Sequence, residues 1–148
     1  MKKFHFRLEP VLKIKEKALD DKMLELAKIT GLYQEEEGKL GNLANKKQKV
    51  NNDLIKLYQS GECLDIQEVQ SYKDYLISLG SEMIKQEHLL IQIRKAVEEK
   101  QNAVREALKE KNILEKLKEK QSQKHYSELL QKEAIELDDI AISRYKAV

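Results

Sequence analysis

The sequence is poor in residues that interrupt helices, because its 148 positions include one proline and five glycines. Tryptophan is absent, and aromatic residues make up 5% of the chain. Charged residues, by contrast, make up 36%. Sparse turn residues in a charged, leucine-rich chain are typical of long helices or a coiled coil.

Several classes of protein are disfavoured by what is missing. The single cysteine, Cys63, excludes an intramolecular disulfide and fits a reducing cytosol. The first residues are charged from Lys2 onward and lack a signal-peptide core, and no apolar run is long enough to span a bilayer. The net charge is +2 with both signs interleaved, which argues against a nucleic-acid binder. We expect a cytoplasmic protein that is not inserted in the membrane.

The residue types of catalytic and metal sites are present but scattered. His5, His88 and His125 lie far apart and show no metal-ligand spacing, and there is no phosphate-binding glycine loop. The pairs Asp20-Asp21 and Asp138-Asp139 are interpreted as solvated carboxylates, since a helical rod offers no closed pocket to shift their pKa values. We therefore predict no catalytic residue, cofactor or metal, and no enzymatic activity.

Apolar residues follow a heptad through the first third of the chain. Residues 1–9 form a predicted extended arm in which Phe4, Phe6 and Leu8 alternate, and Pro10 suits the first position of a helix. The predicted first helix covers 10–58. Its a positions are Leu12, Leu19, Leu26, Tyr33, Leu40, Lys47 and Leu54.

The clear break in the pattern lies at residues 59–64, which we predict to be a hairpin loop. Gly61 suits a left-handed helix C-cap, and Asp65 suits the N-cap of a second helix. The second helix is predicted over 65–145. A loop this short makes the two helices antiparallel neighbours.

The register of the hairpin follows from folding the chain about Cys63. Leu43 then faces Met83, and each polar seam residue faces an apolar one until Lys15 meets Lys111. Long polar stems can lie along an apolar partner while their charge stays in water. This pattern predicts an all-α fold, a long two-helix antiparallel coiled-coil hairpin in one domain of residues 1–148.

The first helix is too short to cover the second along its whole length. Residues 118–125 are polar without interruption, which fits a helix that has no neighbour there. Apolar periodicity resumes at Tyr126, Leu129, Leu130, Leu137 and Ile140. We predict a single-helix overhang over about 118–145, either a docking segment for a partner or a surface for self-association.

The two ends of the chain carry a resemblance to a known family. The first is Phe4-x-Phe6-x-Leu8-Glu9-Pro10-Val11-Leu12, and the second is Glu136-Leu137-Asp138-Asp139-Ile140-Ala141 with Arg144-Tyr145. With the helix lengths, these motifs resemble the FliJ family of flagellar type III export proteins. The resemblance covers the whole chain. The polar residues Lys15 and Lys111 depart from the family pattern that we expect.

The resemblance implies a stalk similar to the central shaft of rotary ATPases. Its implied partners are the hexameric flagellar export ATPase, the membrane export gate protein FlhA and the export chaperones, at the cytoplasmic face of the inner membrane at the flagellar base. The implied ATPase contacts are Phe6, Arg7, Leu8, Leu12, Lys13, Leu137, Asp138, Ile140, Arg144 and Tyr145. The implied gate contacts are Tyr58, Tyr75 and Gly80, although the interpretation of the two tyrosines as ordinary surface residues is favoured.

Two other functions fit a coiled coil of this kind. One is a holdase-type chaperone that grips clients with exposed helix tips, which the short hairpin tip disfavours. The other is a structural spacer, which leaves the alternating apolar residues of the arm unexplained.

Overall fold

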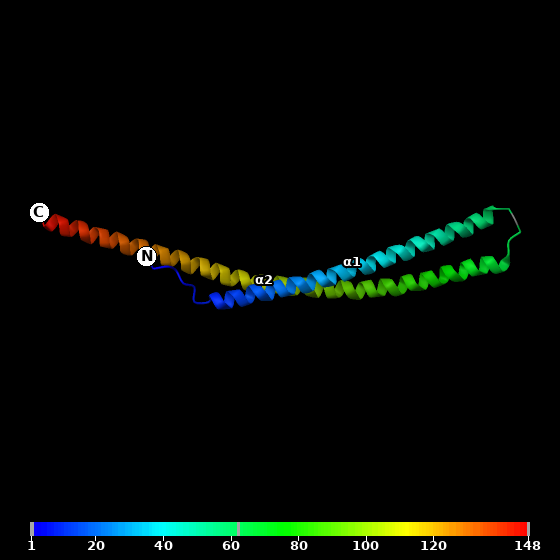
Figure 1. Ribbon diagram of the computed structural model, residues 1–148, viewed down its shortest axis with the longest axis horizontal. Helices are drawn as coiled ribbons and strands as arrows, with labels where there is room; N and C mark the ends of the chain where they lie inside the picture. The colour runs from blue at the N-terminus through cyan, green and yellow to red at the C-terminus, as the bar shows by residue number, and fades with distance from the viewer. Residues whose placement is uncertain (1, 62, 148) are drawn as a thin grey trace. The chain divides into compact units, whose positions relative to one another are not determined.

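The computed structural model describes residues 2–61 and 63–147 and consists of two helices, α1 (Glu9–Gln59) and α2 (Ile66–Lys146). The described residues contain no strand. The helices pack against each other as an antiparallel pair, so the predicted all-α hairpin is confirmed (Figure 1). None of the helices in this described part is long and apolar enough to cross a membrane.

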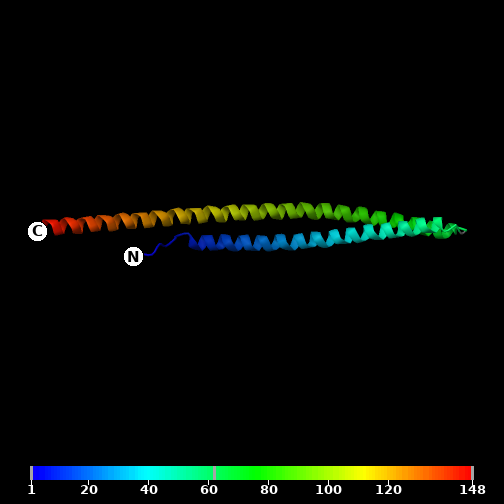
Figure 2. The same cartoon turned by 90° about the horizontal axis from the view of Figure 1, so that it is seen from above.

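Contacts divide the chain into two units, and both helices contribute to each unit. Unit 1 contains residues 1–22 and 103–148, and unit 2 contains residues 23–102. Within each unit, the stretch of α1 lies beside the stretch of α2, as the two views of the chain show (Figures 1 and 2). Each unit is therefore a segment of two-helix coil with its own seam.

The seam of unit 2 follows the predicted heptads. Leu54, Leu79, Leu90, Ile93 and the charged Glu36 are buried, and the other a and d residues are half-buried except for Lys47, which is exposed. Leu79 has only 3% of its surface exposed, whereas Ile77, two residues away, is 72% exposed. A narrow apolar stripe, with charge on the remaining surface, is what a two-stranded coil requires.

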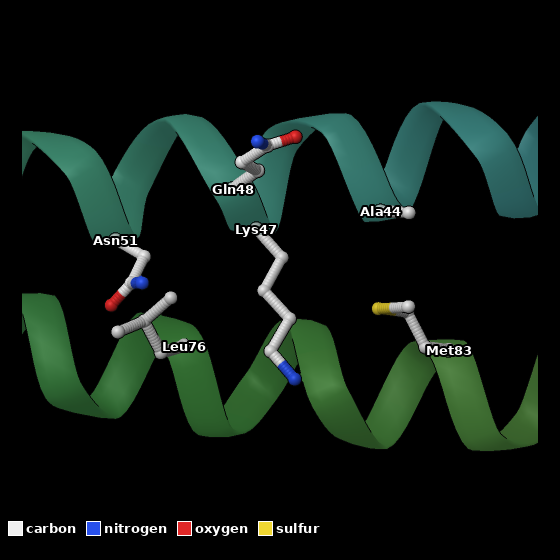
Figure 3. A pocket seen from close by; sticks show the side chains of 6 residues that line it. All are labelled: Ala44, Lys47, Gln48, Asn51, Leu76 and Met83. Carbon is white, nitrogen blue, oxygen red and sulfur yellow. The ribbon is translucent and has the colours of Figure 1, made fainter.

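Lys47 shows how a charged residue is accommodated at a seam position. Its methylene chain extends from α1 towards α2 between Leu76 and Met83, and the ammonium group lies over the ribbon of that helix in this view (Figure 3). With Ala44, Gln48 and Asn51, these residues line a shallow groove of about 370 Å³. The stem thus covers apolar surface while the charge remains hydrated.

A polar pair interrupts the apolar seam in unit 2. Glu36 is buried, with 8% of its surface exposed. The amide of Gln86 donates to the Glu36 carboxylate at 2.5 Å and to its backbone carbonyl at 2.9 Å, and the ammonium of Lys39 lies 2.9 Å from the same carboxylate. Because no buried side-chain nitrogen or oxygen of the described residues lacks a hydrogen-bond partner, the layer tolerates burial of a charge.

The hairpin loop belongs to unit 2 and has the predicted caps at both helix ends. Gly61 has a φ of 69°, which an L-residue rarely adopts. At the other side, the carboxylate of Asp65 accepts from the backbone N–H of Gln67 at 3.0 Å, as an N-cap does. Glu62, which falls within the predicted loop, lies outside the described residues.

In unit 1, the two lysines that are predicted to face each other, Lys15 and Lys111, form separate ion pairs. Lys15 lies 2.8 Å from Glu110, and Lys111 lies 3.5 Å from Glu115. Leu12 and Leu19 remain buried on either side of this layer. Two like charges at facing seam positions are thus neutralised by acidic residues at the border of the seam, so the coil continues.

The seam assignment predicts a large difference between two neighbouring positions. Leu79→Asp should lower the free energy of unfolding by roughly 2–5 kcal/mol, since it places an unpaired charge in the seam. Ile77→Asp introduces the same charge on the exposed face and should change stability by less than about 0.5 kcal/mol. Urea denaturation followed by circular dichroism measures both. Equal losses for the two variants would refute the seam.

The polar layer predicts a specific dependence of stability on pH. Hydrogen bonds from Lys39 and then Gln86 lower the pKa of Glu36 from its usual 4.5. The stability contributed by its charged form is therefore complete above pH 4.5 and is lost as the pH falls through the lower folded-state pKa. Melting temperatures of the wild type and of Glu36→Gln should converge on acidification below pH 4.5. A constant difference between them down to pH 2 would contradict this assignment.

Candidate protein-binding site

The residues before α1 form an arm that lies against α2 inside unit 1. Residues 2–6 have no regular secondary structure, and a turn follows at residues 7 and 8, where the N–H of Glu9 donates to the carbonyl of Phe6 at 3.2 Å. Leu8 accepts from Leu12 at 2.9 Å. The helix thus begins at Glu9, and Leu8 is both its capping residue and the last residue of the arm.

Two polar contacts mark where the arm meets α2. The carboxylate of Glu9 lies 2.8 Å from the ammonium of Lys118. Further along, the ring Nε2 of His125 lies 3.1 Å from the carbonyl of Lys2 and must donate to it, because a carbonyl only accepts. The arm therefore runs along α2 from Lys118 to His125, antiparallel to that helix.

Aromatic side chains also take part in packing the arm, in addition to the two polar contacts. Phe6 is buried, with 3% of its surface exposed, and Phe4 is half-buried. The Phe4 ring lies 5.6 Å from the His125 ring, which in turn lies 5.6 Å from Tyr126 in an edge-on arrangement. The sequence pattern gives no direct signal for this cluster, because its members come from opposite ends of the chain.

The arm covers part of α2, so the uncovered part of that helix begins later than the sequence predicts. From the sequence we expect the overhang to start at about residue 118, since residues 118–125 are all polar. In the structure, Lys118, Ser122, His125 and Leu129 are half-buried, and every described residue from Leu130 to Ala147 is exposed. The polar stretch does have a neighbour, namely the arm, which sequence periodicity cannot reveal because the arm is not helical.

The uncovered segment, residues 130–147 of α2, is amphipathic, and its acidic residues lie between positions 133 and 139. Leu130, Leu137 and Ile140 are each more than half exposed and recur at the spacing of one helix face. The segment carries Glu133, Glu136, Asp138 and Asp139 as well, with Lys132, Arg144 and Lys146 as its basic residues. An exposed apolar stripe of this kind is a typical surface for docking a partner protein.

The structure separates the expected ATPase contacts into two groups. Phe6 and Leu12 are buried in unit 1, where they hold the arm and the seam. The remaining eight are on the surface, at the arm and first turns (Arg7, Leu8, Lys13) and on the uncovered segment (Leu137, Asp138, Ile140, Arg144, Tyr145). A partner can reach this second group while the arm is docked.

The expected gate contacts lie in unit 2. Tyr58 of α1 and Tyr75 of α2 are each about half exposed, and Gly80 is half-buried. Tyr75 borders a shallow pocket with Glu68, Ser71 and Tyr72, and Gly80 borders a wider groove with Ile77 and Ile84. The two tyrosines are thus accessible, and Tyr75 and Gly80 border different grooves.

Residues of the types that could bind a metal ion are present in the described part of the chain. No three His, Cys, Asp or Glu side chains there are placed to hold a metal ion. Cys63 is exposed on the loop.

The burial of Phe6 gives a test of how the arm is docked. Phe6→Ala removes the one fully seated side chain of the arm, whose burial contributes about 1.5–3 kcal/mol. We expect the arm to detach and the helices to keep their melting temperature, so that trypsin cleaves after Arg7 faster than in the wild type. Leu8→Ala, at a partly exposed neighbour, is the control. Unchanged cleavage in Phe6→Ala would show that the arm is not held by Phe6.

The chain is similar to flagellar proteins over nearly its whole length. A family model described as "Flagellar FliJ protein" matches residues 4–147. A flagellar FliJ protein of Bacillus subtilis (strain 168) is 28% identical over 146 residues, which cover 96% of this chain and 95% of that protein. No solved structure shows a significant match.

Proposed function

The chain belongs to the FliJ family of flagellar proteins and is a component of flagellar protein export, and on that premise we propose that it is a stalk for the hexameric export ATPase. In this role it binds the ATPase, promotes its assembly and activity, and links it to the export gate protein FlhA. It also escorts export chaperones at the cytoplasmic face of the membrane. It has no catalytic activity of its own.

The observation that supports this proposal most directly is the uncovered segment of α2. A helix that served only as a spacer would need no apolar stripe beyond its partner helix. Leu130, Leu137 and Ile140 are instead left exposed in a helix that continues to Lys146. A binding protein that completes this stripe accounts for its sequence.

The narrow cross-section of unit 1 suits contact with a ring. Two helices side by side span on the order of 20 Å, given about 10–12 Å for each. A rod that touches some subunits of a hexamer more than others favours particular nucleotide states of those subunits. This is coupling by differential binding, in which the rod itself makes and breaks no bond.

The central test is the effect on ATP turnover. Adding this protein to the cognate export ATPase should raise both the turnover rate and the fraction of hexamer, measured by phosphate release and by analytical ultracentrifugation. If neither changes, the stalk proposal is wrong. Suppression of client aggregation without any effect on the ATPase would indicate a holdase-type chaperone.

A pair of variants tests which face of the uncovered segment binds. Leu137 and Ile135 are similarly exposed, at 66% and 60%, but two residues of helix place them on nearly opposite faces. Leu137→Ser should weaken ATPase binding about tenfold or more, as expected for the loss of a buried leucine. Ile135→Ser, the matched control, should bind as the wild type does. The reverse result would assign the interface to the other face.

A further inference from the structure

The docked arm displays positive charge on its outer side. The Phe4 ring lies next to His125 of α2 and Phe6 is buried, while Lys2, Lys3 and Arg7 are exposed. The aromatic residues and the basic residues of the arm therefore serve different purposes. The aromatic residues attach the arm, and the basic residues face solvent.

Beyond the arm, the same face of α2 carries acidic residues. The half-buried row Lys118, Ser122, His125 and Leu129 advances by three or four residues at each step. The same steps lead to Glu133, Glu136 and Ile140, all exposed on the uncovered segment. Since residues at this spacing share one helix face, basic and acidic strips follow each other on one side of unit 1.

We propose that the partner binds across this junction as one continuous surface that carries acidic groups opposite the arm and basic groups opposite Glu133 and Glu136. This inference rests on the proposed function, because it specifies the surface of the ATPase that receives the chain. An apolar contact with Leu137 and Ile140 lies beside the basic part of that surface.

The alternation of charge excludes simpler partners. A nucleic acid or an anionic membrane would attract Lys3 and Arg7 but would be repelled by Glu133, Glu136, Asp138 and Asp139. A uniformly basic protein surface would be repelled by the arm. Only a surface with both signs in the matching order meets neither repulsion.

Phe6 and His125 are positioning residues in this arrangement. Phe6 is buried and cannot touch the partner, and His125 holds the carbonyl of Lys2. If the arm detaches, Lys3 and Arg7 leave their places next to the acidic strip. Binding of the partner should consequently depend on Phe6 even though it makes no contact there.

Charge reversal on each strip gives the decisive experiment. The cognate export ATPase is titrated with the wild type, with Lys3→Glu/Arg7→Glu, and with Glu133→Lys/Glu136→Lys, at low and at moderate salt. We expect both double variants to weaken binding at least tenfold at low salt. Lys46→Glu/Lys49→Glu and Glu82→Lys/Glu99→Lys make the same charge changes on exposed residues of unit 2 and should bind as the wild type does.

The signs of the two effects identify the partner surface. Opposite effects, with one variant weakened and the other strengthened, would mean a partner of one sign and would overturn the inference. Unchanged binding of both variants would overturn it as well. If the wild type fails to bind the ATPase at all, the proposed function fails together with the inference, so the two failures are distinguishable.

The positioning role of Phe6 is measured separately. The proton shifts of the His125 ring report whether the Phe4 ring stacks on it, and so whether the arm is docked. Phe6→Ala should lose both the docked shifts and at least tenfold of the affinity, and Phe6→Leu should recover both. If the proton shifts of the docked state are lost while the affinity stays at the wild-type value, binding of the partner does not depend on the docked arm.

Discussion

Burial of one apolar stripe between two helices is the constraint on which the rest of the structure depends. A two-stranded coil has no interior apart from its seam, and no described side chain here is completely enclosed. Hydrophobic stabilisation is therefore distributed over many half-buried contacts. Polar residues such as Glu36 and Lys47 are tolerated at seam positions because water or a hydrogen-bonding partner is always within reach.

The same constraint explains how the chain separates stability from binding. Where α1 is present, the apolar residues of α2 are used by the seam. Beyond it, the arm covers a polar stretch with two aromatic side chains, and the following segment keeps an apolar stripe free. Contacts available to a partner therefore lie at the end of unit 1, on residues whose substitution leaves the seam intact.

Much of the fold could be predicted because heptad spacing is a local property of the sequence. The hairpin, its register and the caps at Gly61 and Asp65 all follow from spacing and from residue type. The bond from Gln86 to Glu36 was not foreseen, since it joins adjacent layers and the facing residue of each is apolar. The packing of the arm against α2 could not be predicted for a different reason: non-helical residues have no periodicity that specifies what they pack against.

The candidate site was only partly predictable. Exposed members such as Leu137 and Ile140 follow from amphipathic spacing on an unpaired helix, and the burial of Leu12 follows from its seam position, whereas the burial of Phe6 depends on how the arm packs. The roles of the individual surface residues depend on the shape of another molecule. That information is not contained in one chain.

The unbroken course of α2 from the seat of the arm to its end has a geometric consequence. Each residue turns the helix by about 100°, so the direction of the last apolar stripe is set by counting residues from Leu129. One inserted residue at that point would rotate the acidic and apolar faces by more than a quarter turn relative to the basic arm. Insertion of seven residues, close to two whole turns, would restore the angle and displace the faces along the axis by about 10 Å. The number of residues in this part of α2 therefore sets both the angle and the distance between the arm and the last apolar stripe.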